Sequence, residues 1–338
     1  MKTNEGEDMA ASLSAPIMIG GVGVFNRVFL APMSGVTDAC FRRLAWRFGA
    51  GLVFSEMVAS EALLAGEPGM ALKAASADVT PHAVQLAGRE PRWMALAARL
   101  AEDNGADIID INMGCPAKRV TTGYSGSALM RDPDLALSIV RAVVGAVSVP
   151  VTLKMRLGWD ERSINAPQIA AAARDGGVAM ITIHGRTRCQ FYDGRADWSA
   201  VRAVRDAVDI PLVVNGDIAS ASDAETARRL SGADAVMIGR ASYGAPWLAG
   251  RIASGAGPIA PALIAETAIE HYEAMLSLHG RESGRRQARK HVSWYLDALR
   301  LPSSSRLRKA MLTADDPASV LAGLRLLARD PGHMAEAA

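Results

Sequence analysis

The chain has 338 residues, of which half are apolar, and it contains 31 glycines but few aromatic residues. This length and composition allow one large domain with an extensive core and one small domain. The formal net charge is only +2, which excludes the strongly basic class of proteins that bind nucleic acids over their whole surface.

The three cysteines are Cys40, Cys115 and Cys189, an odd number at wide spacings. This pattern argues against a disulfide framework and a zinc site, so we expect no bound metal and a reducing, cytoplasmic location. No uncharged apolar run reaches membrane-spanning length, and residues 1–15 are polar and acidic, unlike a signal peptide. We expect residues 1–15 and the tail at 329–338 to be disordered, and the protein to be a monomer.

Eight short apolar runs, each ending in a polar or glycine-rich tip, alternate with helical segments rich in Ala, Arg and Leu. The runs are RVFLAPM (27–33), LVFSEM (52–57), HAVQLAG (82–88), IIDINMGC (108–115), PVTLKMR (150–156), MITIHGR (180–186), PLVVNGD (211–217) and AVMIGR (235–240). Continuous apolar runs are typical of strands buried on both faces, and strands that alternate with helices predict a parallel sheet. Eight such units match the size of an α/β protein of the (β/α)8 TIM barrel class. A doubly wound open sheet is the alternative fold.

The Gly-rich stretch GGVGVF (20–25) precedes the first run and lacks the spacing of a dinucleotide-binding fingerprint. We interpret it as a β-hairpin that closes the bottom of the barrel. The β/α pattern stops after Arg240, and a Gly/Pro/Ala-rich connector (244–261) leads into amphipathic helical sequence. We therefore predict a barrel domain at 16–250 and an all-α, helical C-terminal domain at 251–328.

Positive charge is concentrated in one segment of the predicted helical domain. From Arg281 to Lys309 the chain has nine Arg or Lys and only two acidic residues, which gives this segment a net charge of +7. Such asymmetry favours an anionic partner, although a solvated helix face explains it equally well from charge alone. The candidate contacts to an anionic partner are Arg285, Arg286, Arg289 and Lys290.

In a (β/α)8 barrel the active site lies at the carboxyl ends of the strands. These ends are Pro32-Met33, Glu56, Gln85, Asn112 with Cys115, Lys154, His184, Asn215-Gly216-Asp217 and Gly239-Arg240. The loops after the seventh and eighth strands form the standard phosphate site of this fold, where glycine exposes backbone N–H groups and Arg240 can pair with phosphate oxygens. The alternative is a pair of glycine turns with a surface arginine.

Lys154 and Gln85 each end a predicted strand and therefore point toward the same mouth. A flavin requires a cation near its N1/C2=O edge and amide groups along its pyrimidine edge, and these two side chains fit that requirement. The alternative for Lys154 is a side chain that extends along the surface into solvent.

Cys115 follows the fourth strand in NMGCPAKRV, where Gly114 and Pro116 predict a tight, exposed loop. An ordinary cysteine thiol is mostly protonated at neutral pH, so a thiol placed over a substrate can act as a general acid. The alternatives are a nucleophile, which requires a neighbouring base, and a buried inert thiol, the role we expect for Cys40. His184 also ends a strand, and its neutral imidazole fits either a flavin phosphate or a substrate carbonyl.

The order of these motifs resembles that of the tRNA-dihydrouridine synthase family, most closely its bacterial DusB-type branch. The matching motifs are APMSGVTD (31–38), SEM (55–57), QLAG (85–88), DINMGCPAKRV (110–120), GSALM (126–130), PVTLKMRLGWD (150–160), ITIHGRTR (181–188), NGDI (215–218) and DAVMIGRASYGAPW (234–247). In addition, RKHVSWYL (289–296) resembles the helical C-terminal domain of that family. The resemblance spans residues 16–300 and is specific, because the motifs occur in the same order.

The resemblance implies an enzyme that reduces the C5–C6 double bond of tRNA uridines, using FMN and usually NADPH, or NADH, as the reductant. It implies that flavin N5 gives a hydride to C6 and that Cys115 protonates C5, with tRNA bound by Asn112, Arg186 and the basic helical segment. The implied FMN contacts are Pro32, Met33, Ser34, Gln85, Lys154, His184, Asn215, Gly216, Asp217, Gly239 and Arg240. Two other functions stay open: a flavin oxidoreductase for a small pyrimidine, and a non-catalytic RNA-binding protein on the same barrel.

Overall fold

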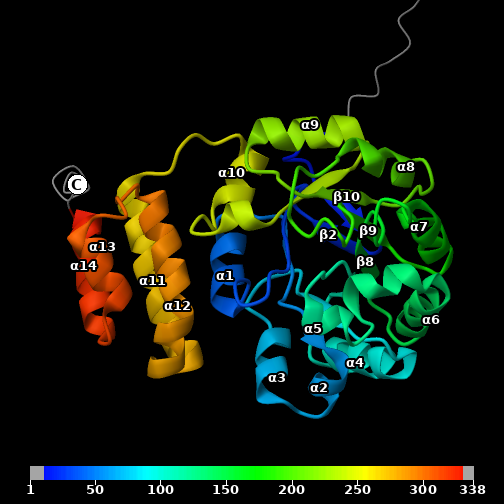
Figure 1. The fold of residues 1–338 in the computed structure, drawn as a ribbon, viewed down its shortest axis with the longest axis horizontal. Helices are drawn as coiled ribbons and strands as arrows, with labels where there is room; N and C mark the ends of the chain where they lie inside the picture. The colour runs from blue at the N-terminus through cyan, green and yellow to red at the C-terminus, as the bar shows by residue number, and fades with distance from the viewer. Residues whose placement is uncertain (1–10, 330–338) are drawn as a thin grey trace, which may run out of the picture.

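The structure, a computed structural model, describes residues 11–329 and contains a parallel β-barrel beside a helical domain (Figure 1). Nine strands form one sheet in the order β4-β3-β11-β10-β9-β8-β7-β6-β5, and every neighbouring pair is parallel. Their bounds are β3 Val28–Leu30, β4 Leu52–Val53, β5 Val58–Ala59, β6 Ala83–Ala87, β7 Ile108–Met113, β8 Val151–Arg156, β9 Met180–His184, β10 Leu212–Asn215 and β11 Ala235–Ile238.

The two ends of this sheet meet just beyond β4. Phe54 forms a parallel bridge with Ala83 of β6, and the Ser55 N–H donates a hydrogen bond to the Ala83 carbonyl at 2.9 Å. Each of the eight predicted runs contributes a strand, and the strands follow one another around the sheet in chain order. The predicted TIM barrel is therefore confirmed, and the doubly wound alternative is wrong. The short strand β5 is an addition that the sequence pattern did not predict.

The hairpin expected from the Gly-rich stretch is formed by β1 (Ile17–Ile19) and β2 (Val22–Val24), which pair antiparallel. Ile19 packs in one apolar cluster with Ile108 and Met180, which lie at the amino ends of two barrel strands. The hairpin therefore closes the bottom of the barrel, opposite the predicted active site.

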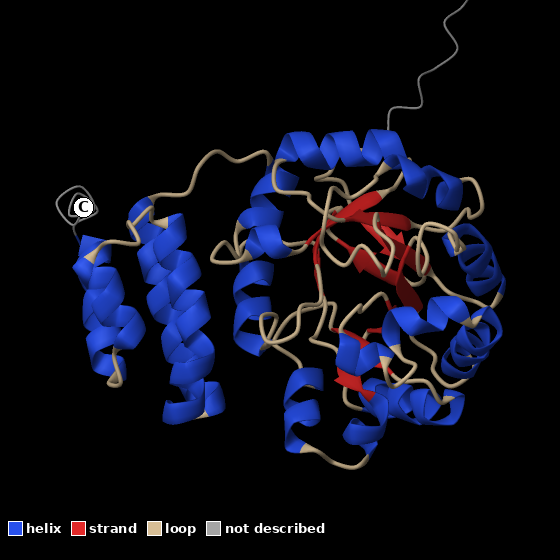
Figure 2. Ribbon diagram, in the orientation of Figure 1, coloured by secondary structure: helices blue, strands red, loops and turns tan. Residues whose placement is uncertain are grey.

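Helices follow the strands and cover the outside of the barrel (Figure 2). The longer helices bury an apolar face: in α4, for example, Met94, Ala97, Ala98 and Ala101 recur at helical spacing and are buried. The bounds are α1 Ala39–Arg47, α2 Ser60–Leu64, α3 Pro68–Ala74, α4 Pro91–Asp103, α5 Lys118–Thr121, α6 Pro133–Val144, α7 Ala166–Asp175, α8 Arg202–Arg205, α9 Ala221–Ser231 and α10 Leu248–Ser254. Three short 3₁₀ segments are η1 Gly126–Arg131, η2 Ser199–Val201 and η3 Arg240–Ser242.

Four helices make up the C-terminal part of the chain, at the left of Figure 1, namely α11 Pro261–His279, α12 Arg281–Ala298, α13 Arg306–Thr313 and α14 Pro317–Arg329. They enclose an apolar core of their own, which includes Tyr295, Leu296 and Leu324. Helix α10 crosses the expected boundary near residue 250, and its Ile252 and Ala253 pack into the barrel core. Regular structure stops between α10 and α11, so the connector joins two separately packed cores.

Helix α1 of the barrel contacts the helical domain through polar and apolar groups. The two terminal nitrogens of Arg47, Nη1 and Nη2, each donate to the carboxylate of Glu270 at 2.6 Å. His279 Nε2 lies 3.2 Å from Asp38 Oδ2. Cys40 is buried in the apolar cluster of the helical domain, in agreement with its predicted core role. Burial, and then the charge of Asp38, raises the pKa of the Cys40 thiol to about 12, so this thiol is inert at neutral pH.

We expected residues 1–15 and 329–338 to be disordered. Of these, residues 1–10 and 330–338 lie outside the described residues. Leu13 is buried, and its carbonyl accepts a hydrogen bond from the Arg27 N–H at 2.9 Å, so packed structure begins before residue 16. Of the helices in the described range, none is both long enough and apolar enough to cross a membrane.

Candidate active site

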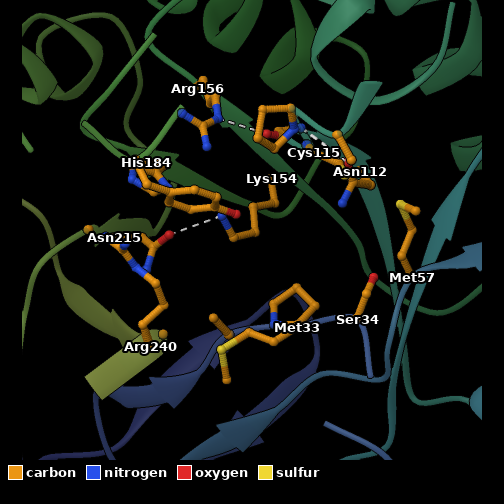
Figure 3. Close-up of a pocket in the computed structure, with 18 of the residues that line it drawn as sticks. Met33, Ser34, Met57, Asn112, Cys115, Lys154, Arg156, His184, Asn215 and Arg240 are labelled. Atoms are coloured by element: carbon orange, nitrogen blue, oxygen red, sulfur yellow. Dashed lines mark hydrogen bonds between the residues drawn. The ribbon is translucent and has the colours of Figure 1, made fainter. Parts of the chain in front are cut away.

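A cavity of about 680 Å³ opens at the carboxyl ends of the barrel strands (Figure 3). All eleven residues that were expected to contact FMN line this cavity, and so do Cys115 and Asn112. Because the strands of the barrel are parallel, the tips of β3 and of β6 to β11 deliver these side chains to one place. The fold therefore assembles the expected set in a single pocket, while the role of each residue stays a prediction.

A chain of hydrogen bonds crosses the barrel interior at this pocket. The Asp110 carboxylate accepts from the Thr152 hydroxyl (2.6 Å) and from the Gln85 side-chain amide (2.7 Å). The Gln85 side-chain carbonyl accepts from the Asn112 amide (2.8 Å), and Asn112 Oδ1 accepts from the Cys115 backbone N–H (3.0 Å). This network fixes the orientation of both amides and anchors the beginning of the loop that carries Cys115.

Lys154 supplies a buried positive charge to the pocket. Its ammonium donates to Asn215 Oδ1 at 3.1 Å, and the Asn215 amide donates to the Met237 carbonyl at 2.8 Å. Burial, and then the charge of Arg156, lowers the pKa of Lys154 to about 8, although the charge of Asp110 opposes the change. Burial likewise raises the pKa of Asp110 to about 6. Lys154 is therefore mostly charged at neutral pH but poorly solvated, which favours an anionic group beside it.

The tips of β10 and β11 offer backbone donors that have no hydrogen-bond partner in the described part of the chain. The N–H groups of Asp217, Ile218, Arg240 and Ala241 donate to no backbone carbonyl within residues 11–329. Gly216 has a φ of 117°, and a Cβ at this position would lie 2.7 Å from the Ala196 side chain, so only glycine fits this turn. Free N–H groups beside a guanidinium are the donor set that a phosphate requires, and the residues present therefore fit a flavin phosphate.

Asp217 organises this corner through its carboxylate, which accepts from Arg186 Nη1 (3.1 Å), Arg240 Nη2 (3.2 Å) and the Ala196 N–H (2.8 Å). Partial burial raises the pKa of Asp217, but the hydrogen bonds from Arg186 and Ala196 outweigh it and hold the pKa below its ordinary value. The ionised carboxylate is saturated with donors. It therefore positions Arg240 instead of offering a free group to a ligand.

Arg186, which we expected to contact tRNA, is enclosed by protein groups, and its contact with tRNA stays a prediction. Its side chain is only 1% exposed, and its guanidinium donates to the carbonyls of Asp193 and Gly194 as well as to Asp217. Its physical role is to brace the loop after β9 against the tip of β10.

His184 lies at the end of β9, where its Nε2 is 3.2 Å from Arg186 Nη1. Arginine has only donors, so Nε2 must accept this hydrogen bond and the ring proton must reside on Nδ1. Burial, and then the nearby charges of Arg156 and Lys154, lowers the pKa of His184 well below its ordinary value. His184 is therefore a neutral residue of the pocket wall whose Nδ1–H is left for a ligand.

The loop that carries Cys115 is fixed by two hydrogen bonds and by the close approach of Gly126. Arg156 Nε donates to the Gly114 carbonyl at 2.8 Å, and the Ser127 hydroxyl donates to the Cys115 carbonyl at 2.9 Å. Gly126 has a φ of 60°, and a Cβ there would lie 2.9 Å from the Cys115 carbonyl oxygen. The thiol itself is partly exposed and lines the pocket. A fixed backbone with an accessible thiol is what a positioned proton donor requires.

Sequence reasoning missed two residues that shape the pocket, Arg156 and Tyr192. Arg156 is buried and also donates to the carbonyls of Thr187 and Phe191, both at 2.8 Å, so it ties the Cys115 loop to the loop after β9. The ring of Tyr192 lies 4.6 Å from the Arg240 guanidinium and 5.5 Å from that of Arg156. Arg156 follows Lys154 by two residues on one strand, and this alternation was a usable signal. The loop that carries Tyr192 offered none.

The basic segment of the helical domain is only partly free. Arg281 pairs with Asp316, Arg285 with Asp315 and Arg308 with Asp297. The side chain of Arg285 is 13% exposed and also pairs with Glu282, so its guanidinium is already occupied, and its contact with an anionic partner stays a prediction. In the part of the chain that the structure describes, the cations of this segment without an ion pair are Arg286, Arg289, Lys290, Arg300, Arg306 and Lys309. We call Arg286, Arg289 and Lys290 the α12 cations.

The closed barrel and the polar pocket at the carboxyl ends of its strands define an enzyme of the TIM-barrel class. Residues 29–330 match the profile of the family described as Dihydrouridine synthase (Dus), and the chain belongs to this family. All residues that line the pocket lie within this matched range.

Two relatives show how much of the chain is shared. A protein of Rhizobium leguminosarum bv. phaseoli, named as a probable tRNA-dihydrouridine synthase, is 58% identical over 305 residues, which cover 90% of this chain and 95% of that protein. The tRNA-dihydrouridine synthase B of Xanthomonas axonopodis pv. citri is 44% identical over 334 residues, which cover 95% of this chain and 100% of the relative.

Among solved structures, the chain is similar in fold to an old yellow enzyme homologue from Zymomonas mobilis. The TM-score is 0.52 at 18% identity, with 74% of this chain and 95% of that chain covered. Histamine dehydrogenase from Rhizobium sp. 4-9 gives a TM-score of 0.57 at 16% identity, with 79% of this chain covered. The chain covers 50% of the length of that dehydrogenase. At these identities the comparison supports the barrel fold alone.

Proposed function

We propose that this protein is a flavin-dependent tRNA-dihydrouridine synthase, which adds a hydride and a proton across the C5–C6 double bond of uridine in tRNA. The observation that carries the proposal is the meeting of a partly exposed cysteine, a buried lysine and a phosphate-type donor set in one pocket. Membership of the dihydrouridine synthase family supports this substrate class, because the relatives that share most of the chain carry that activity in their names.

The proposed cofactor is FMN, with NADPH or NADH as the reductant. The N–H groups after β10 and β11 and the Arg240 guanidinium would bind the ribityl phosphate, while Pro32, Met33 and Ser34 would line the ring. When bound, the flavin accepts a hydride from the nicotinamide and supplies one to C6 of the uracil ring. Lys154 would stabilise the negative charge at the N1/C2=O edge, and its poor solvation makes that interaction stronger than it is in water.

The proposed proton donor is Cys115. Its thiol gives its proton to C5, and the thiolate that results regains a proton from water, so one hydride and one proton are added in total. The hydrogen bond from the Cys115 N–H to Asn112 holds the loop while the proton is transferred. His184 adds a neutral donor, which fits either the flavin phosphate or a carbonyl oxygen of the base.

The proposed RNA substrate must present a uridine that has left its base stack, because the reacting carbons lie inside a pocket. The α12 cations are exposed and would bind the phosphates of the same RNA, which makes binding sensitive to salt. The proposed oligomeric state of the enzyme is the monomer. The cytoplasm, where tRNA and NADPH are available, is its proposed location.

A direct test is to purify the protein, identify the flavin that it releases on denaturation, and incubate the enzyme with NADPH and tRNA from a strain lacking the gene. The proposal predicts FMN in the released cofactor and dihydrouridine in the digested tRNA. FAD or no flavin, or unchanged tRNA, would contradict it. Free uracil and uridine serve as parallel acceptors, and their reduction in preference to tRNA would favour an oxidoreductase for small pyrimidines.

A further inference from the structure

Helix α12 contacts two of the loops that form the wall of the pocket. The ring of Tyr243, which lines the pocket, stacks on Trp294 of α12 with centroids 4.2 Å apart and planes 19° apart. Gly244 lies so close to helix α12 that a Cβ at this position would lie 2.4 Å from the carbonyl carbon and oxygen of Trp294. In the loop after β3, a Cβ on Gly35 would lie 2.9 Å from Lys290 Nζ. The helical domain therefore supports the pocket directly.

The stacked Tyr243 is linked by a short segment to the anion site. Tyr243 directly follows η3, whose Arg240 and Ala241 carry two of the free N–H groups. The Tyr243 N–H donates to the Arg240 carbonyl at 3.0 Å, so a movement of Tyr243 is transmitted to these groups. Trp294 itself does not line the pocket and acts on it only through Tyr243.

Trp294 is also aligned with the exposed cations of its own helix. Arg286, Lys290 and Trp294 follow one another at intervals of four residues and therefore share one face of α12. The indole is held from behind by His291, whose ring lies 5.1 Å away at 80°, and His291 in turn lies 5.9 Å from Phe41 of the barrel helix α1. A polyanion bound along this face would thus end at an indole that is fixed against the barrel.

We propose that Trp294 is a positioning residue for the active site: its stack on Tyr243 fixes the pocket wall after β11 and couples tRNA bound along α12 to the reacting groups. This inference rests on the proposed function. It assigns to the helical domain a part in the reaction itself, in addition to the binding of RNA.

The test compares Trp294→Ala, Trp294→Phe and Trp93→Ala, in which Trp93 is a partly exposed tryptophan on the barrel helix α4 that serves as the matched control. For Trp294→Ala we expect the affinity for tRNA to stay within about two-fold, since the α12 cations are retained. The kcat at saturating tRNA should fall on the order of ten-fold or more, because misplacement of a supporting group lowers the rate without weakening binding. Trp294→Phe retains a stacking ring and should recover most of the rate, while Trp93→Ala should match the wild type.

A merely structural role would lower the melting temperature but leave kcat per bound FMN unchanged, and that result would overturn the proposal. Tyr243→Ala should reproduce the loss, and the double variant should be no slower than the slower single variant, because both act through one contact. If the losses in kcat of the two single variants multiply in the double variant, that result would also overturn the proposal. The visible flavin spectrum gives a readout that does not depend on turnover: added tRNA should perturb the spectrum of the wild type and not that of Trp294→Ala. Failure of the proposed function would instead appear as wild-type enzyme that forms no dihydrouridine.

Discussion

Replacing Lys154 with methionine should stabilise the flavin-free protein while abolishing its activity. Burial lowers the pKa of Lys154 from 10.5 to about 8. Since each pKa unit is worth about 1.4 kcal/mol, the charged side chain costs the folded state roughly 3 kcal/mol at neutral pH. Methionine removes this cost but also loses the hydrogen bond to Asn215, worth about 1 kcal/mol. We therefore expect the free energy of unfolding at pH 7 to rise by about 2 kcal/mol.

The gain in the free energy of unfolding of Lys154→Met should become smaller as the pH rises. Because the folded-state pKa lies below the unfolded value of 10.5, unfolding takes up a proton between about pH 8 and 10.5, and the folded wild type becomes more stable as pH rises through this window. The advantage of Lys154→Met should therefore be largest below pH 8 and shrink toward pH 10.

Urea unfolding of the two flavin-free proteins at neutral and at alkaline pH measures this difference. The exposed Lys309, replaced by methionine, is the matched control and should show no comparable change. A Lys154→Met protein that is less stable than the wild type at neutral pH would refute the reasoning, as would a gain that does not shrink at alkaline pH. Either result would mean that the lysine is not held in the folded state against a cost of desolvation.

Three further changes test other parts of the site. Cys115→Ala should retain FMN and NADPH oxidation but lose dihydrouridine formation by about 10²–10⁴-fold, whereas Cys189→Ser, at an exposed cysteine, should behave as the wild type in the same tRNA assay. Gly216→Ala should lower the affinity for FMN by an order of magnitude or more in fluorescence titrations, because its Cβ has no room, while Gly257→Ala, where nothing lies within 4 Å, should not. Replacing the three α12 cations with alanine should weaken tRNA binding and flatten its dependence on salt by a slope of roughly two to three, with FMN content unchanged. Unaltered salt dependence would leave the barrel rim as the RNA site.

The barrel could be predicted from the sequence because every βα unit carries its own local signal. A strand buried on both faces must be apolar along its length, so a polar residue at its end is conspicuous, as with Lys154 after PVTL and Asn215 after PLVV. Parallel strands bring all such ends to one mouth, and the pocket follows from the fold without knowledge of side-chain geometry.

The parts that could not be predicted depend on contacts between distant segments. Arg285 was counted as a free cation because the charge was summed only from Arg281 to Lys309. Its partner Asp315 lies outside that segment, in the turn between α13 and α14, and approaches Arg285 only in the folded protein. The enclosure of Arg186 could not be predicted either, because the Asp193 and Gly194 carbonyls that accept its hydrogen bonds lie in the loop after β9. Asp110 was missed although it precedes Asn112 by two residues, the spacing of side chains that share one face of a strand.

The most direct test of the account is to incubate wild-type and Cys115→Ala enzymes, each loaded with FMN and reduced by NADPH, with tRNA that lacks dihydrouridine. Mass spectrometry of the digested nucleosides then measures how much dihydrouridine each enzyme forms. We expect the wild type to form dihydrouridine with the oxidation of one NADPH per uridine reduced, and Cys115→Ala to oxidise NADPH but leave the tRNA almost unchanged. If the loaded and reduced wild type forms no dihydrouridine, or if Cys115→Ala forms it at the wild-type rate, the central claim is contradicted.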